Sequence, residues 1–310
     1  MSVRSSILTA ILAAGLVASA GAQQFRTGIE VVRVDALVMA GRHPVIGLRA
    51  EDFDIRDSGV AQTVYDLSFE RLPLNIICVL DVSGSVQGEP LRRLREGTTA
   101  IIDALAADDR AALIAFSNRL NLHTGLTGDK EKLKTTLANV EAGNATAMLD
   151  ATFAGLTLRD TDPGRTLLLL FTDGIDTASW LTARRVLDAA RRTDVVVYPV
   201  SVRTAPQMSI VTRYSGPGVA PIRQQSTQLS KESETLLKAF AEETGGRFFV
   251  VDRQTDLRQA FLDVVKEFRQ RYVLTYTPSG VPATGWHPLE VRVKNRDVQV
   301  TARRGYHTSR

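Results

Sequence analysis

The chain has 310 residues, of which 44% are hydrophobic and 23% are charged. This length and composition are sufficient for one large buried core with a smaller module beside it, and they exclude an intrinsically disordered protein. The formal net charge of +4 becomes +3 without residues 1–22, whose only charged residue is Arg4. Basic residues are scattered, and pairs such as Arg191-Arg192 are expected on solvated helix faces, so no nucleic-acid partner is expected. The single cysteine, Cys78, excludes an intramolecular disulfide.

The amino terminus has the features of a signal peptide over residues 1–22. Arg4 precedes an apolar stretch over 7–17 that is too short to span a bilayer. Ala20-Gly21-Ala22 then supplies a small-x-small cleavage site, which places the mature start at Gln23. No later stretch is apolar for long enough to cross a membrane. We therefore expect a protein that is soluble after export, either periplasmic or secreted.

The remaining elements alternate between strand and helix in the middle of the chain. Residues 28–39 and 54–69 are strand-like. Strands are then expected over 74–80, 111–116, 166–171, 195–202 and 247–251, with 120–126 as an antiparallel edge strand. Helices are expected over 90–106, 130–140, 147–158, 181–192, 234–243 and 257–268. This rhythm predicts an α/β fold with a doubly wound, mostly parallel six-stranded sheet.

The carboxyl-terminal flank returns to strand patterns over 272–277, 289–293 and 298–302. Each flank is too short to form a stable core alone. We therefore predict that residues 23–73 and 271–310 pair into one small antiparallel β module, with the α/β domain, residues 74–270, inserted between them. Residues 203–233, rich in Pro, Ser, Gln and Gly, are expected to leave the sheet at its carboxyl edge. They could extend a site there or be an insertion without a role.

Oxygen-bearing side chains follow the ends of two of these strands. The apolar run over 77–80 stops at Asp81-x-Ser83-x-Ser85, and a second run ends in Thr-Asp173-Gly. Thr146 precedes a helical pattern between them. If the strand order is 3-2-1-4-5-6, Asp81 and Asp173 end neighbouring strands at the switch point of the sheet, where such folds bind ligands. Oxygen donors alone indicate a hard cation, Mg²⁺ with Mn²⁺ or Ca²⁺ as alternatives, rather than zinc.

Each motif also has a purely structural interpretation. Asp-x-Ser-Gly-Ser is ordinary turn chemistry, and Thr-Asp-Gly after a strand is often a turn. Thr146 by itself is typical of a helix cap. The three motifs occur in the order and strand context of one site, and this combination favours a metal site.

Together, Asp81, Ser83, Ser85, Thr146 and Asp173 resemble the complete metal-ion-dependent adhesion site of von Willebrand factor type A domains. The resemblance covers roughly residues 74–270. It implies that the three hydroxyls approach the metal, while the two carboxylates bind it directly or through water. Such a ligand set leaves the cation electrophilic, so it can take an acidic group of a protein partner as its last ligand.

The flanks resemble the outer segments of an exported bacterial group of type A proteins of the kind found in Acidobacteria. The segments concerned are Gly47-Leu-x-x-x-Asp-Phe53, Gly59-Val-x-Gln62 and Gly305-Tyr306. This part of the resemblance adds no ligand or activity.

The sequence therefore predicts a divalent-cation-dependent binding or adhesion protein, not an enzyme. A metal-dependent, phosphatase-like hydrolase using the same pocket is one alternative, and a structural assembly subunit is another. In the phosphatase alternative Asp81 would be the nucleophile, but the general acid expected two residues later is replaced by Ser83. The histidines, His43, His123, His287 and His307, are isolated in sequence.

Overall fold

A computed structural model describes residues 31–69, 72–143, 145–158, 164–172, 175–202, 226–252 and 255–308. The expected signal peptide lies outside the described residues, and so does most of the segment over 203–233. None of the helices that the structure describes combines the length and apolar character that a membrane span requires.

Within these ranges, six strands form a sheet with the order β11-β10-β9-β6-β7-β8. They are β6 (Leu74–Asp81), β7 (Arg110–Phe116), β8 (Leu120–Thr127), β9 (Arg165–Thr172), β10 (Val196–Val202) and β11 (Phe249–Val251). Neighbouring strands are parallel except for β7 and β8, which are antiparallel. Numbered along the chain, this is the order 3-2-1-4-5-6, the condition under which the ends of β6 and β9 are neighbours, and β8 is the expected antiparallel edge strand. The predicted fold class is confirmed.

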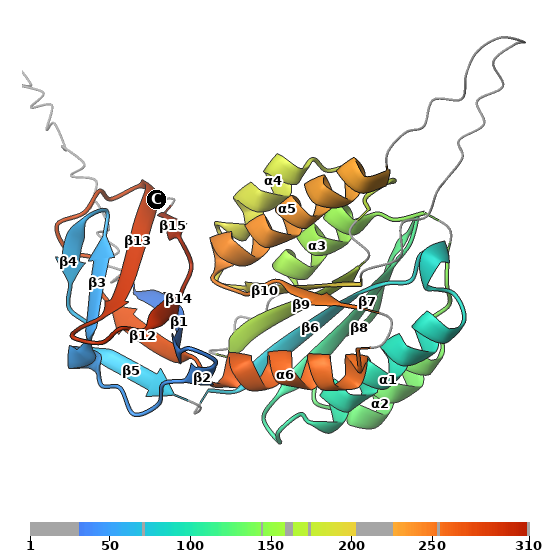
Figure 1. Cartoon of the computed structure of the whole chain (residues 1–310), viewed down its shortest axis with the longest axis horizontal. Coiled ribbons are helices and arrows are strands. Elements are labelled where there is room, and N and C mark those ends of the chain that lie inside the picture. Colours follow the sequence, from blue (N-terminus) through green and yellow to red (C-terminus); the bar gives the residue numbers. More distant parts are fainter. Residues whose placement is uncertain are drawn as a thin grey trace, which may run out of the picture. The chain divides into compact units, whose positions relative to one another are not determined.

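Helices cover both faces of this sheet (Figure 1). One face carries α3 (Met148–Thr157), α4 (Ala183–Ala190) and α5 (Ser226–Thr244), and the other carries α1 (Glu89–Asp103), α2 (Lys130–Ala138) and α6 (Leu257–Arg269). The central strands β6 and β9 are buried at every position, as expected for a sheet covered on both sides. Cys78 lies in β6, where burial raises the pKa of its thiol to about 12.

Local signals explain where several helices begin. Asp129 and Asp256 are the N-caps of α2 and α6, and each accepts backbone N–H groups of the first turn. Helix α1 begins with a proline in its first turn after Gly88, which has a φ of 76°.

Helix α5 begins at Ser226, earlier than the expected start at 234. Residues 226–233 are mostly polar, so they lack the apolar periodicity by which a helix is predicted from sequence, yet the helix includes them.

The two flanks form one β module of two sheets (Figure 1). The first sheet has the order β14-β1-β12-β5, with β2 on β1, and the second has the order β15-β13-β3-β4. The amino-terminal elements are β1 (Val32–Ala40), β2 (His43–Pro44), η1 (Ala50–Asp52), β3 (Phe53–Asp57), β4 (Val60–Gln62) and β5 (Asp66–Phe69). The carboxyl-terminal ones are β12 (Tyr272–Tyr276), β13 (Gly285–Val293), β14 (Gln299–Thr301) and β15 (Gly305–Thr308). Both sheets contain strands from both flanks, which confirms the predicted pairing of the two ends.

A buried polar cluster joins the two flanks inside the module. Asp57, at the end of β3, is 0% exposed. Its Oδ2 accepts hydrogen bonds from the hydroxyls of Tyr276 and Tyr306, at 2.8 and 2.6 Å. Its Oδ1 lies 3.0 Å from Nδ1 of His287, whose ring stacks on Tyr306. One amino-terminal carboxylate thus holds three carboxyl-terminal side chains, and this arrangement links the halves of the module.

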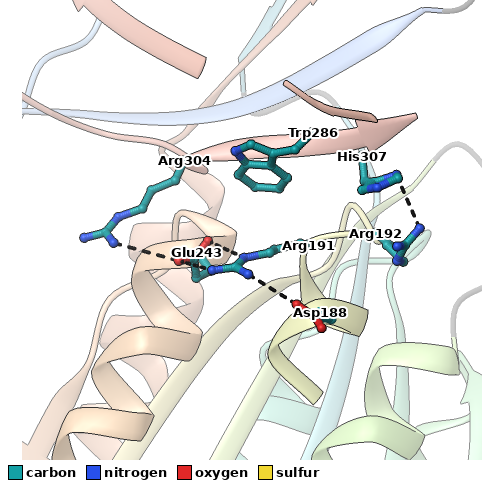
Figure 2. A pocket seen from close by; sticks show the side chains of 7 residues that line it. All are labelled: Asp188, Arg191, Arg192, Glu243, Trp286, Arg304 and His307. Carbon is teal, nitrogen blue, oxygen red and sulfur yellow. Dashed lines mark hydrogen bonds and ion pairs between the residues drawn. The ribbon is translucent and has the colours of Figure 1, made fainter. Parts of the chain in front are cut away.

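Described residues of the α/β domain contact the module around Arg165 and around Arg191. At the first, the guanidinium of Arg165 donates to Asp35 of β1 at 2.7 Å and to the carbonyl of Phe268 at 2.8 Å. At the second, a pocket of about 490 Å³ lies between the carboxyl ends of α4 and α5 and strands β13 and β15 (Figure 2).

Arg191 organises this pocket. Its guanidinium donates two hydrogen bonds of 2.9 Å to Glu243, lowering the pKa of that carboxyl, and it lies 5.5 Å from the ring of Trp286. Arg304 of the module approaches Glu243 at 3.8 Å from another side. Arg191 therefore does not lie on a simple solvated helix face, contrary to the expectation from sequence.

We predict that Asp57→Ala lowers the free energy of unfolding by at least about 3 kcal/mol, because three buried hydrogen-bonding groups lose their acceptor. Urea denaturation measures the loss. Asp54→Ala is the matched control on the same strand, because Asp54 is partly exposed and its ion pair with Arg56 is 3.5 Å long. It should change the stability by about 0.5 kcal/mol or less. A loss below about 1 kcal/mol for Asp57→Ala would contradict the role of the cluster.

Candidate metal site

The candidate site is built around a buried carboxylate at the carboxyl end of β6. Asp81 is 0% exposed, and its Oδ1 accepts the backbone N–H of Ser83 at 2.9 Å. Its Oδ2 accepts the hydroxyl of Thr172 at 2.8 Å. Leu80 pairs with Phe171, so Asp81 and Thr172 are the next residues on adjacent parallel strands. A buried carboxylate is costly unless donors or cations satisfy it, and the strand order supplies one of these donors.

The loop that carries Thr146 is held against the ends of β6 and β7. The Gly143 N–H donates to the carbonyl of Val82 at 2.7 Å, and the Ala147 N–H donates to the carbonyl of Ser117 at 2.8 Å. A Cβ at Gly143 would lie 2.1 Å from Oγ of Ser117, so only glycine fits there. These contacts bring the buried Thr146 to the edge of the sheet where Asp81 lies.

The loop after β9 closes on the other side of Thr146. The N–H groups of Thr177 and Ala178 both donate to the carbonyl of Thr146, at 2.8 and 3.0 Å. In return, the Thr146 N–H donates to Oγ1 of Thr177 at 3.0 Å. The backbone of Thr146 is therefore fixed by a segment that directly follows the second predicted motif.

The same loop caps helix α3. Oγ of Ser179 accepts the N–H groups of Leu149 and Asp150, at 3.0 and 3.2 Å, and itself donates to Asp176 at 2.6 Å. The N-cap residue of α3 is Ala147, without a side-chain cap. Thr146 is thus not the cap of this helix, and that structural interpretation of Thr146 is wrong.

The structure brings Asp81, Ser83 and Thr146 to one edge of the sheet. Ser85 lies in the short helix η2 (Gly84–Val86), but its side chain is outside the described residues, as is the whole of Asp173. The three described residues are buried and carry hard oxygen donors, a set that suits Mg²⁺, Mn²⁺ or Ca²⁺. Among the described residues, there is no group of three or more His, Cys, Asp or Glu side chains that could hold a metal ion.

Sequence reasoning missed the residues that position the site. Thr172 had a visible signal, since it is a polar residue at the end of an otherwise apolar run. Asp176 and Ser179 had none, because their partners on α3 are about 30 residues away in the sequence.

Comparison with known proteins gives a match to one domain family. Residues 76–175 match the von Willebrand factor type A domain family. The chain contains a von Willebrand factor type A domain. Such domains are known for metal-dependent protein–protein interaction.

Two relatives in sequence each match a part of this chain. The uncharacterized protein sll0103 of Synechocystis sp. is 46% identical over 52 residues, which are 17% of this chain and 12% of that protein. The human inter-alpha-trypsin inhibitor heavy chain H4 is 27% identical over 133 residues, 39% of this chain and 14% of that protein. The chain thus spans about an eighth of the length of these relatives.

Solved structures share the fold at low identity. Proximal thread matrix protein 1 of the mussel byssus is 17% identical, with 69% of this chain and 51% of that chain covered and a TM-score of 0.51. A second structure of that protein, with a zinc-occupied MIDAS motif, has a TM-score of 0.50. A von Willebrand factor type A protein from Catenulispora acidiphila is 11% identical, covers 80% of this chain and 71% of its own, and has a TM-score of 0.50.

We predict that Thr172→Val lowers the free energy of unfolding by about 1.5–3 kcal/mol. The substitution removes the hydroxyl that donates a hydrogen bond to the charged carboxylate of Asp81. Thr152→Val is the matched control. Thr152 is also buried, but its hydroxyl donates to the carbonyl of Met148 within α3, so its loss should cost about 1 kcal/mol or less. Urea denaturation with EDTA present keeps metal binding out of the comparison. Equal losses of unfolding free energy in the two variants would show that the hydrogen bond to Asp81 stabilises the fold no more than an ordinary buried hydrogen bond.

Proposed function

We propose that the protein is an exported binding protein that uses a divalent cation to hold an acidic group of a protein partner. The observation that carries this proposal is the convergence of Asp81, Ser83 and Thr146, all buried oxygen donors, at one edge of a von Willebrand factor type A sheet. Export rests on the predicted signal peptide over residues 1–22.

In this proposal each residue of the site has a limited role. Asp81 and Asp173 provide negative charge, while Ser83, Ser85 and Thr146 provide neutral hydroxyls. A bound cation would supply an electrophilic position for a carboxylate oxygen of the partner. Because this ligand set carries only two negative charges, the cation would keep a positive charge that attracts the partner's carboxylate. The zinc-occupied MIDAS motif in the mussel protein supports metal binding by this type of domain. We propose Mg²⁺ or Mn²⁺ for this chain, since hydroxyl and carboxylate oxygens are hard donors.

We also propose that the protein binds without turnover. The two contacts described for Asp81, from the Ser83 N–H and the Thr172 hydroxyl, hold its carboxylate in place. The histidines that could move protons lie on other elements: His43 in β2, His123 in β8, His287 in β13 and His307 in β15. This placement favours a binding site over the hydrolase alternative.

We predict that the mature protein binds one Mn²⁺ or Mg²⁺ and that Asp81→Asn and Asp173→Asn weaken this binding by about 100-fold or more. Loss of one negative charge beside a divalent cation removes several kcal/mol of attraction, even at an effective dielectric constant of about 20. Asn retains the size of the side chain, so the fold should persist. Equilibrium dialysis with Mn²⁺ measures the binding, and circular dichroism checks the fold. Asp188→Asn, on α4, is the matched control and should bind metal like the unchanged protein.

The binding function is tested by using the mature protein to capture a partner protein from an envelope extract. Capture should disappear with EDTA, return with Mg²⁺, and fail in Ser83→Ala and Thr146→Ala. Undiminished metal stoichiometry in Asp81→Asn and Asp173→Asn would refute the site. Hydrolysis of phosphate or peptide substrates, abolished by Asp81→Asn, would instead establish the enzyme.

A further inference from the structure

One large apolar side chain beside the candidate site points into solvent. Trp180, on the loop after β9, is 95% exposed. Ile175 on the same loop is 39% exposed. The second tryptophan of the chain, Trp286, is also 39% exposed but lies near the guanidinium of Arg191. A single exposed apolar residue is ordinary, whereas an almost completely exposed indole leaves one of the largest apolar side chains in water.

The backbone around Trp180 is nevertheless held firmly. The carboxylate of Asp150 on α3 accepts the N–H of Trp180 at 3.0 Å and the N–H of Leu181 at 2.9 Å. On the other side of Trp180, Ser179 accepts two N–H groups from the first turn of α3. The loop and the helix therefore satisfy each other's backbone groups. A side chain presented on a fixed backbone loses little entropy when it binds, which is the property of a preorganised contact.

The same loop places Trp180 near the candidate metal ligands. Ala178, two residues before Trp180, donates its N–H to the carbonyl of Thr146 at 3.0 Å. Because consecutive Cα atoms are about 3.8 Å apart, the Cα atoms of Trp180 and Ala178 are at most about 7.6 Å apart. An extended peptide advances about 3.3 Å per residue. A peptide with its acidic residue at the site could thus reach the indole within a few residues.

We propose that Trp180 is the apolar anchor of the partner-binding surface. The partner is then a protein segment with an Asp or Glu residue and, within about three positions, an aliphatic residue or proline that packs on the indole. This inference rests on the proposed function, because the acidic residue needs the cation. A polypeptide is the partner class that supplies a carboxylate and an apolar side chain at this short spacing. Tryptophan is enriched among the residues that contribute most to protein–protein binding.

The test uses an array of synthetic peptides, each with one Asp in a Gly/Ser background and one variable position from three residues before to three after it. The variable residue is Leu, Pro, Ser or Lys. The mature protein, applied with Mn²⁺, should bind peptides with Leu or Pro at one position about 10-fold or more better than those with Ser. Trp180→Ala should lose this preference while its Mn²⁺ binding in dialysis is unchanged. Trp180→Phe should retain part of the preference.

A control and a second readout complete the experiment. Ile46→Ala removes another exposed apolar side chain, in the β module, and should leave the preference intact. In a Trp286→Phe background, Trp180 is the only indole, and its fluorescence should be accessible to a soluble quencher and become protected when a preferred peptide binds. An indole that is already protected in the free protein would overturn the proposal.

The outcomes separate this inference from the proposed function. Binding that needs Mn²⁺ and a peptide Asp but is equal in Trp180→Ala overturns only the role of Trp180. Binding that persists in EDTA or in Asp81→Asn overturns the metal-dependent function, and this inference with it. If Mn²⁺ occupies the site but no peptide of the array binds, the proposal that the partner is a linear acidic segment is overturned.

Discussion

Burial of the Asp81 carboxylate is the constraint on which the arrangement of the α/β domain depends. A carboxylate that is 0% exposed requires hydrogen-bond donors or a cation. The turn after β6 provides one donor, the Ser83 N–H, and the neighbouring strand β9 provides another, the Thr172 hydroxyl. The second donor exists only because the strand order places β6 beside β9. The crossover topology and the chemistry of the site are therefore consequences of the same arrangement.

The loop after β9 links the candidate site to the exposed Trp180. It fixes the backbone of Thr146 and caps α3 through Ser179, while Asp150 of α3 holds the loop around Trp180. Each segment satisfies backbone groups that the other would leave unpaired, so neither can move far without losing several hydrogen bonds. This mutual support holds the backbone at Trp180 in a defined position although its side chain is 95% exposed. It also means that the loop's polar residues hold the backbone of Thr146 and the first turn of α3 in place.

The β module depends on residues from both ends of the chain. Both of its sheets combine strands from the two flanks, and Asp57 joins His287, Tyr276 and Tyr306 across them. Insertion of a complete domain between two halves has an entropic cost that grows only slowly with the length of the insert. The inserted domain contacts the module through Arg165 and through the cluster around Arg191 (Figure 2). The buried contacts that unite the two flanks offset this cost.

The sequence alone determined the apolar runs, their alternation with helical patterns, and the carboxylate and hydroxyls that follow β6. Because these features are periodic or adjacent in the chain, they predicted the doubly wound, mostly parallel sheet, its antiparallel edge and the β module. Only the tertiary structure decided that Thr172 would bond Asp81, and that Asp57 would meet His287. It also decided that Trp180 would be left in water. Such pairings depend on the register between elements that are far apart in the chain. Periodicity reports which face of an element is apolar, but it carries no information about which distant polar group will lie opposite.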